Sequence, residues 1–138
     1  MIKFEFVKKL KEEGFPQTLA SNMIYDEEGK LQVLIPEYVE KRGGKEGIRK
    51  DCFYIPEAEE FMRDVKGRLL GIRVTHFNDG MAKFTAYELS PIMGVPSVVG
   101  EGMSLTESLA VFWLGVNEKK KWIEKNQKTK LQKPKENK

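Results

Sequence analysis

The chain has 138 residues and a mass of 15.9 kDa, a size that fits one small domain. Its 24 Lys and Arg nearly balance 21 Asp and Glu, and apolar residues make up 40% of the chain at a mean hydropathy of −0.50. No apolar run approaches the roughly 20 residues that a membrane-spanning helix requires, which excludes a bilayer-spanning protein. Because Cys52 and His76 are the sole cysteine and histidine, an internal disulfide, a cysteine-based zinc site and a multi-histidine metal site are excluded as well.

The first residues predict no export signal. Residues 1–15 alternate charged with apolar side chains, and they lack both an unbroken apolar stretch and a small-residue cleavage site. We therefore expect a cytoplasmic protein. We also predict that the protein contacts no membrane and requires no cofactor.

Positive charge is concentrated in the C-terminal segment. Residues 125–138 carry six Lys and one Glu, a net charge of +5, which leaves a net charge of −2 on residues 1–124. The segment contains a proline, and Leu131 is its single apolar residue, so it buries too little surface to offset the entropy of ordering. We predict one folded domain over 1–124 and a disordered basic tail over 125–138. The tail either binds a phosphate backbone in a salt-dependent manner or only increases solubility.

The N-terminal half predicts a helix followed by a β-hairpin. Apolar residues recur at helical spacing over 2–13, and Gly14 ends the helix. The start of the helix is less well defined, because Ile2, Phe4 and Phe6 also alternate as they would in a strand. Short apolar runs over 22–25 and 31–35 are separated by an acidic link that ends in glycine, which is typical of a hairpin. The next segment, residues 40–50, is rich in glycine and basic side chains and predicts a flexible loop.

The middle of the chain predicts a second helix and a second hairpin. A short strand over 52–55 is followed by a helix that begins at Pro56 and carries glutamates in its first turn. Strands over 69–77 and 81–89 flank an Asn-Asp-Gly turn. Alternation along the first of these strands predicts Leu70, Ile72 and Val74 on one face, with Arg73 and Thr75 on the other. Residues 90–102 hold two prolines and three glycines and predict a loop.

A final helix is the most clearly marked element. Ser104 and Glu107 have the spacing of a capping box, and the helix is expected to run through Lys119 and toward Ile123. Its buried stripe comprises Leu105, Leu109, Phe112, Trp113 and Val116. The predicted order is αββαββα. We expect a two-layer α+β domain, in which the two hairpins form one four-stranded antiparallel sheet and the helices pack on one face.

Two features are candidates for binding a partner. The basic cluster at 41–50 is one, although its glycine spacing does not match a phosphate-binding P-loop. The other is Trp122, which lies among charged residues and either contacts a partner or packs under the sheet edge. The candidate binding residues are Lys41, Arg42, Lys45, Arg49, Lys50 and Trp122.

Catalytic chemistry has only isolated candidates. His76 lies near a turn that contains Asp79, but no nucleophile motif accompanies the two residues. Cys52 lies in a predicted strand, where a buried, inert thiol is the expected state. The acidic clusters have no calcium-loop spacing. We therefore predict no catalytic residues and no metal site, and we keep a small hydrolase that uses Cys52 or His76 as an alternative.

Four stretches carry a resemblance to a known group. The chain resembles small uncharacterised proteins of phages and prophages, especially those of gut Bacteroidetes, which share a helix closing in Gly-Phe-Pro-Gln, a proline-led acidic helix and a late helix opened by Gly, Ser or Thr, and Glu. Residue 108 is serine where alanine is usual in that group. No activity is established for the group, so the resemblance implies a phage-type accessory protein and no site residue. The stretches are Phe6–Gln17, Phe53–Phe61, Phe84–Leu89 and Gly100–Leu114.

These observations favour a non-enzymatic accessory protein that binds a macromolecular partner, with a protein as that partner because residues 1–124 are mildly acidic. The alternative is a nucleic-acid-binding protein that uses the basic loop at 41–50 and the lysine-rich tail. The sequence does not determine the oligomeric state or the identity of the partner.

Overall fold

A computed structural model describes residues 2–89 and 97–136, with side chains through residue 126. It contains five helices and two three-stranded antiparallel sheets, sheet A and sheet B. The mixed α+β class is confirmed. The single four-stranded sheet and the order αββαββα are wrong, because each hairpin gains its own third strand rather than pairing with the other hairpin.

Sheet A forms around the first predicted hairpin, which the structure confirms. Its strands are β1 (Met23–Tyr25), β2 (Leu31–Val33) and β3 (Phe53–Tyr54), in the order β2-β1-β3. Helix α1 (Phe4–Glu12) packs against β3, and the Phe4 ring makes edge-to-face contacts at 5.4 Å with the rings of both Tyr25 and Phe53. The sheet therefore joins the N-terminal helix to the first half of the chain.

The basic segment at 40–50 is mostly helical, which corrects the prediction of a flexible loop. Helices α2 (Pro36–Lys41) and α3 (Gly44–Asp51) occupy it. Gly43 and Gly44 have φ angles of 88° and 80°, a left-handed conformation that lets the chain turn sharply between the two helices. Ile48 of α3 is buried against sheet A in a small second core. The glycines thus join two helices and do not mark an unstructured excursion.

Sheet B forms around the second predicted hairpin. Its strands are β4 (Leu69–His76), β5 (Ala82–Glu88) and β6 (Val99–Gly102), in the order β4-β5-β6. Strand β6 lies inside the segment 90–102 predicted to be a loop, so the loop prediction is wrong for residues 99–102. Residues 90–96 of the predicted loop lie outside the described residues.

The glycines of β6 explain this error. A Cβ added to Gly100 would lie 2.4 Å from the Ser108 carbonyl oxygen, and one added to Gly102 would lie 2.7 Å from the Ser108 amide nitrogen. Glycine is therefore required in this strand because helix α5 crosses it at very short range. The pattern that predicts a loop instead marks a close contact between a strand and a helix.

The remaining helices are α4 (Ala58–Asp64) and α5 (Leu105–Glu136). Helix α4 begins later than predicted, because Glu57 is its N-cap and forms a reciprocal capping box with Glu60. The predicted start of α5 is confirmed, and the Glu107 amide donates to the Ser104 hydroxyl at 3.1 Å.

At its other end α5 continues through Glu136, into the segment predicted to be a disordered tail. Lysine and glutamine have high helix propensity, and a helix that is already nucleated extends at little cost. No finding tests the predicted domain boundary at residue 124, which stays a prediction.

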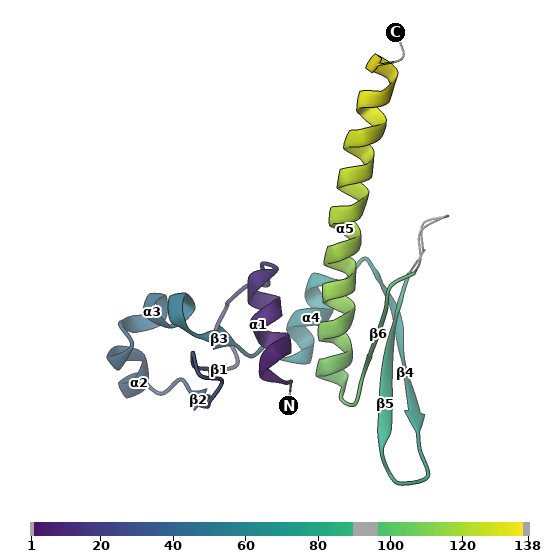
Figure 1. Ribbon diagram of the computed structural model, residues 1–138. Coiled ribbons are helices and arrows are strands. Elements are labelled where there is room, and N and C mark those ends of the chain that lie inside the picture. The colour runs from purple at the N-terminus through teal and green to yellow at the C-terminus, as the bar shows by residue number, and fades with distance from the viewer. Residues whose placement is uncertain (1, 90–96, 137–138) are drawn as a thin grey trace.

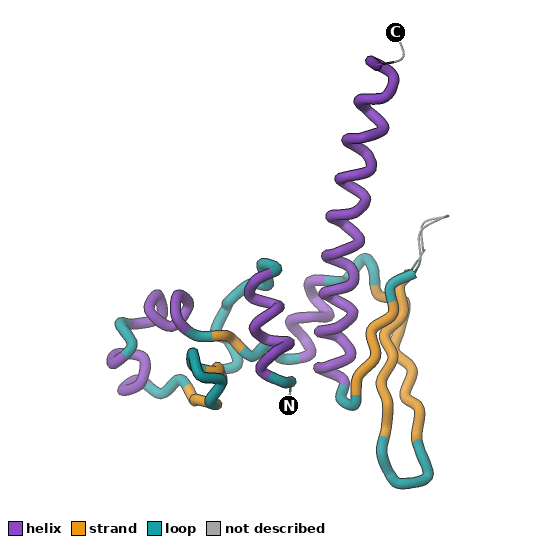
Figure 2. The backbone as a smooth tube through the Cα atoms, in the orientation of Figure 1, coloured by secondary structure: helices purple, strands orange, loops and turns teal. Residues whose placement is uncertain are grey.

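Helix α5 lies at the centre of the arrangement. It packs against β6 and β5 on one side and against α4 and α1 on another, and its far end projects well beyond the rest of the protein (Figure 1). Sheet A with α2 and α3 lies on the opposite side of α1 from sheet B (Figure 2).

No described helix is long and apolar enough to cross a membrane. The main core is formed by residues of α1, α4, α5, β5 and the intervening segments, including Val7, Leu10, Phe61, Ala86, Leu109 and Phe112.

Candidate protein-binding surface

The predicted basic cluster is partly engaged within the protein. Arg42 pairs with Glu27 and also donates to the Tyr38 hydroxyl at 3.0 Å. Arg49 donates to the Gln17 carbonyl at 3.0 Å, an interaction that ties α3 to the chain after α1. Both arginines thus stabilise the fold around sheet A. The exposed members of the cluster are Lys41, Lys45 and Lys50.

The other predicted binding residue lies far from this cluster. Trp122 is 52% exposed on the part of α5 that projects away from the sheets. Helices α2 and α3 lie at the other side of the molecule (Figure 1). The structure therefore does not bring Trp122 together with Lys41, Lys45 and Lys50 in one continuous surface.

The two hydrolase candidates are also apart. Cys52 follows α3 and is buried in the small core beside sheet A, where burial raises the pKa of its thiol. His76 is exposed at the end of β4, in sheet B. A raised pKa lowers the fraction of reactive thiolate. The structure thus gives Cys52 no histidine partner and an unreactive environment.

Three pockets formed by described residues are small. Their volumes are ≈ 170, 120 and 50 Å³, and they lie around α1 with α5, around Phe15 with α4, and around α4 with α5. Small-molecule sites are typically about 300–1,000 Å³. Among the residues with described side chains, no group of three or more His, Cys, Asp or Glu is placed to hold a metal ion.

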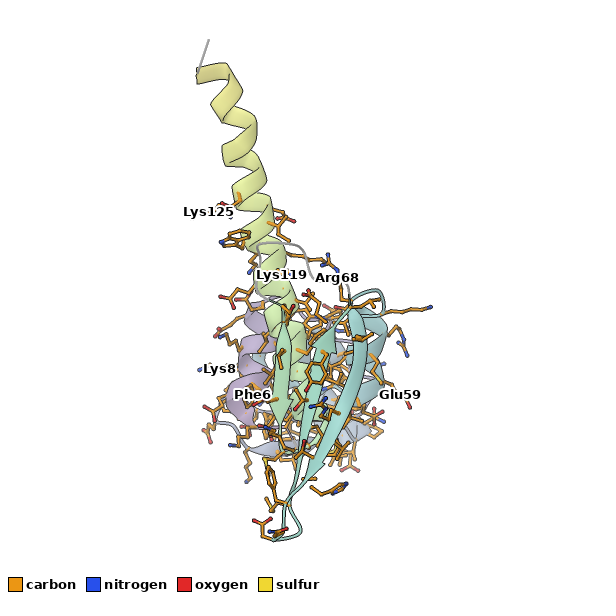
Figure 3. The ribbon with its side chains drawn as sticks, turned by 90° about the vertical axis from the view of Figure 1, so that its right-hand side faces the viewer. Phe6, Lys8, Glu59, Arg68, Lys119 and Lys125 are labelled. Carbon is orange, nitrogen blue, oxygen red and sulfur yellow. The ribbon has the colours of Figure 1, made fainter. Side chains whose placement is uncertain are left out.

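The most distinctive surface is the side of sheet B that faces away from α5, which we call the outer face. Phe84 and Ala86 of β5 are direct partners of Gly102 and Gly100, the glycines that touch α5, so these residues define the inner face. Side chains alternate along a strand, and the outer face therefore carries the odd-numbered residues of 71–77, 81–87 and 99–103. Within the described part of the chain, the helices beside sheet B all lie behind it when the outer face is viewed directly (Figure 3).

The outer face carries exposed apolar side chains around a polar centre. At the centre, the Arg73 guanidinium lies 5.6 Å from the centroid of the Tyr87 ring, and the Lys83 ammonium lies 3.7 Å from a carboxylate oxygen of Glu101. The hairpin end of the sheet extends past the first turn of α5 (Figure 1). The exposed apolar members are Phe77, Met81, Val99 and Met103, with exposed fractions of 45%, 49%, 45% and 47%.

Part of this surface is visible in the sequence. Alternation along β4 predicts that Arg73 and Thr75 share a face, and the structure confirms it. Phe77, Met81 and Met103 give no such signal, because apolar residues at the ends of predicted strands look like core residues. Their exposure follows from α5 covering the inner face of the sheet, which leaves the outer face without a helix in the described part of the chain.

Comparison with known proteins adds no relative. No family model, no curated protein and no solved structure matches this chain.

Proposed function

We propose that this chain is a non-enzymatic binding protein and that it contacts a protein partner through the outer face of sheet B. The observation that supports this proposal most directly is the set of four apolar side chains, each nearly half exposed, on a sheet face away from the described helices. Several apolar side chains that stay exposed on one face of a sheet are a feature of protein interaction sites.

The residue types on this face favour a protein partner. Aromatic residues, methionine and arginine are enriched in protein interfaces, whereas lysine and glutamate are depleted there. The outer face carries two aromatic residues, two methionines and one arginine, and its lysine and glutamate pair with each other. Methionine also adapts its shape to an irregular partner.

A nucleic-acid partner has weaker support. Arg42 and Arg49 of the predicted basic cluster are engaged in contacts within the protein, and the cluster lies far from the basic end of α5. Residues 1–124 carry a net charge of −2. The phage-type origin implied by the sequence resemblance stays a prediction.

Site-specific photo-crosslinking tests the proposal. Benzoylphenylalanine is placed at Phe77, and in separate proteins at Trp122 and at Met62, an exposed methionine of α4 that serves as a matched control. Each protein is irradiated in lysate of the source organism, once with and once without nuclease treatment. We expect a discrete protein adduct from position 77 and none from position 62.

Competition with unlabelled protein identifies the surface that contacts the crosslinked partner. Unlabelled wild-type protein should suppress the adduct, whereas the double variant Phe77→Ser/Met81→Ser should not. Equal adducts at positions 62 and 77, or equal suppression by both competitors, would contradict the proposal. An adduct at position 122 alone would move the contact to α5, and one that disappears with nuclease would favour a nucleic-acid complex.

A further inference from the structure

We propose that two copies of this chain associate through strand β4, which pairs antiparallel with β4 of the second copy and joins two copies of sheet B into one continuous sheet. This association uses the edge of the sheet and not its outer face, so it goes beyond the proposed function and does not depend on it.

The main-chain groups of β4 leave its outer edge open. The Phe77 amide donates to the Met81 carbonyl at 2.9 Å, so the hydrogen-bonding groups of Phe77, Thr75 and Arg73 point toward β5. By alternation, those of Ile72, Val74 and His76 point the other way. Among the described residues the structure gives these outward groups no hydrogen bond, and β5 is the one strand that pairs with β4, whose Leu69 and Ile72 side chains pack against the main core. Such a row of free donors and acceptors is a template for another strand.

The other sheet edges are less suited to pairing. Strand β2 has three residues, and the Ile35 amide folds back to donate to the Val33 carbonyl at 2.9 Å, which occupies an edge acceptor. Strand β6 has four residues, and two of them are glycines held at very short range against α5. With eight residues, β4 is the longest edge among the described strands.

The sequence of β4 favours itself as the partner strand in one register. A bulge lies between Leu69 and Gly71, so regular pairing is confined to the residues after it. If residue 73 were opposite itself, two arginine side chains would face each other, which is unfavourable. If the two-fold axis passes through Val74, Val74 meets its own copy and Arg73 lies opposite Thr75 of the second copy.

That register pairs the outward main-chain groups of β4 and also avoids unfavourable side-chain contacts. All three outward residues find outward partners, since residue 72 then lies opposite residue 76. No like charges are opposed. The Val74 side chain, which is 44% exposed in the single chain, gains an apolar neighbour on the inner face.

The proposal is tested on the full chain by measuring its mass in solution across a range of concentrations. We expect the wild type to approach twice 15.9 kDa as the concentration rises. Val74→Lys should remain a monomer at every concentration, because two ammonium groups would meet at the axis. Val33→Lys is the matched control, since Val33 is 54% exposed on an edge strand of the other sheet, and it should dimerise like the wild type.

A cysteine substitution gives an independent readout that requires no loss of function. Directly opposed residues of a hydrogen-bonded antiparallel pair have Cα and Cβ atoms about 5.5 Å apart, which is too far for an unstrained disulfide but within reach of a short bis-maleimide crosslinker. Such a crosslinker should therefore link Val74→Cys into a covalent dimer and leave Val33→Cys unlinked, with Cys52 buried in both. A wild type that stays monomeric, a dimer that survives Val74→Lys, or equal linking at positions 74 and 33 would overturn the proposal. The variant Phe77→Ser/Met81→Ser should still dimerise, which separates this test from that of the outer face.

Discussion

Lys119 and Glu88 form an ion pair that is almost completely removed from solvent. The ammonium nitrogen lies 2.5 Å from a carboxylate oxygen, and the two side chains are 5% and 1% exposed. The same oxygen accepts a hydrogen bond from the Val98 amide at 3.3 Å. The pair thus connects α5 to the end of β5 and to the residue before β6. Neither residue has a sequence pattern that predicts this contact, because lysines and glutamates are frequent along the chain.

Removing one partner of this ion pair should lower the free energy of unfolding far more than removing both partners. Lys119→Met leaves the Glu88 carboxylate buried without a counter-charge, and we expect a loss of about 3–5 kcal/mol in the free energy of unfolding. Lys119→Met combined with Glu88→Leu should recover most of that loss, since no buried charge remains. Urea unfolding of the wild type, both single variants and the double variant measures the coupling. If the double variant lost as much free energy of unfolding as the two single variants together, this account would be contradicted.

Tyr54 is a second buried polar residue with a defined network. Its hydroxyl donates to Glu60 at 2.5 Å and accepts from the Ser21 amide at 2.9 Å. Burial, followed by the hydrogen bond to Glu60, raises the pKa of the Tyr54 hydroxyl. The protonated form is therefore favoured in the folded state, and its contribution to stability is complete below the unfolded-state pKa of about 10 and declines as the pH rises above it.

The comparison with Tyr54→Phe isolates this contribution. At pH 7 the wild type should be more stable by about 1 kcal/mol, because the variant loses hydrogen bonds to buried groups. The difference in the free energy of unfolding should narrow as the pH rises from 9 to 11. Urea unfolding at each pH gives this difference directly. A difference that is constant across this range would show that the hydroxyl does not titrate as the structure implies.

At the scale of single elements, the contact between β6 and α5 depends on small side chains. Besides the close approach at Gly100, the buried Ser108 hydroxyl donates to the Gly100 carbonyl at 2.8 Å. This bond gives the buried serine a role that an alanine at position 108 could not fill. Farther along the same interface, a Cβ at Gly115 would lie 2.6 Å from a methyl group of Val98.

Gly100→Ala should therefore push the strand and the helix apart. The added carbon would meet main-chain atoms of Ser108 and Phe112, which cannot rotate away, and overpacking of this kind costs about 1–3 kcal/mol. Gly67→Ala is the matched control, because an added Cβ there has no neighbour within 4 Å. Thermal and urea unfolding should show a clear loss for the first variant and a change within about 0.5 kcal/mol for the second. Equal effects would mean that the close contact does not limit stability.

At the scale of the whole molecule, the two sheets and the shared helices form a body from which the end of α5 projects (Figure 1). The main contacts of α5 are with β5, β6, α4 and α1, at the end of the helix that lies beside the sheets. The projecting end is rich in lysine. We therefore expect this end of α5 to contribute little to the stability of the fold.

Removal of residues 127–138 tests this expectation. We expect the free energy of unfolding to change by no more than about 0.5 kcal/mol, because the removed segment lies away from the body. If the full-length protein binds single-stranded DNA, its affinity should fall steeply with added salt and should be lost in the shortened protein. A large loss of stability would instead show that the end of the helix supports the core.

The sequence by itself determined the local elements of this protein. The apolar spacing of α1, the hairpins of β1 with β2 and β4 with β5, and the Ser104 cap at the start of α5 are all encoded within a few neighbouring residues, and each is present. The tertiary structure decided which strands pair, why Gly100 and Gly102 belong to a strand, and which apolar side chains stay exposed. These outcomes depend on contacts between residues distant in the chain, such as Ser108 against Gly100 and Lys119 against Glu88, and no local pattern records such contacts. The candidate surface follows from the same cause, because a side chain of β4 or β5 is exposed or buried according to where α5 crosses the sheet.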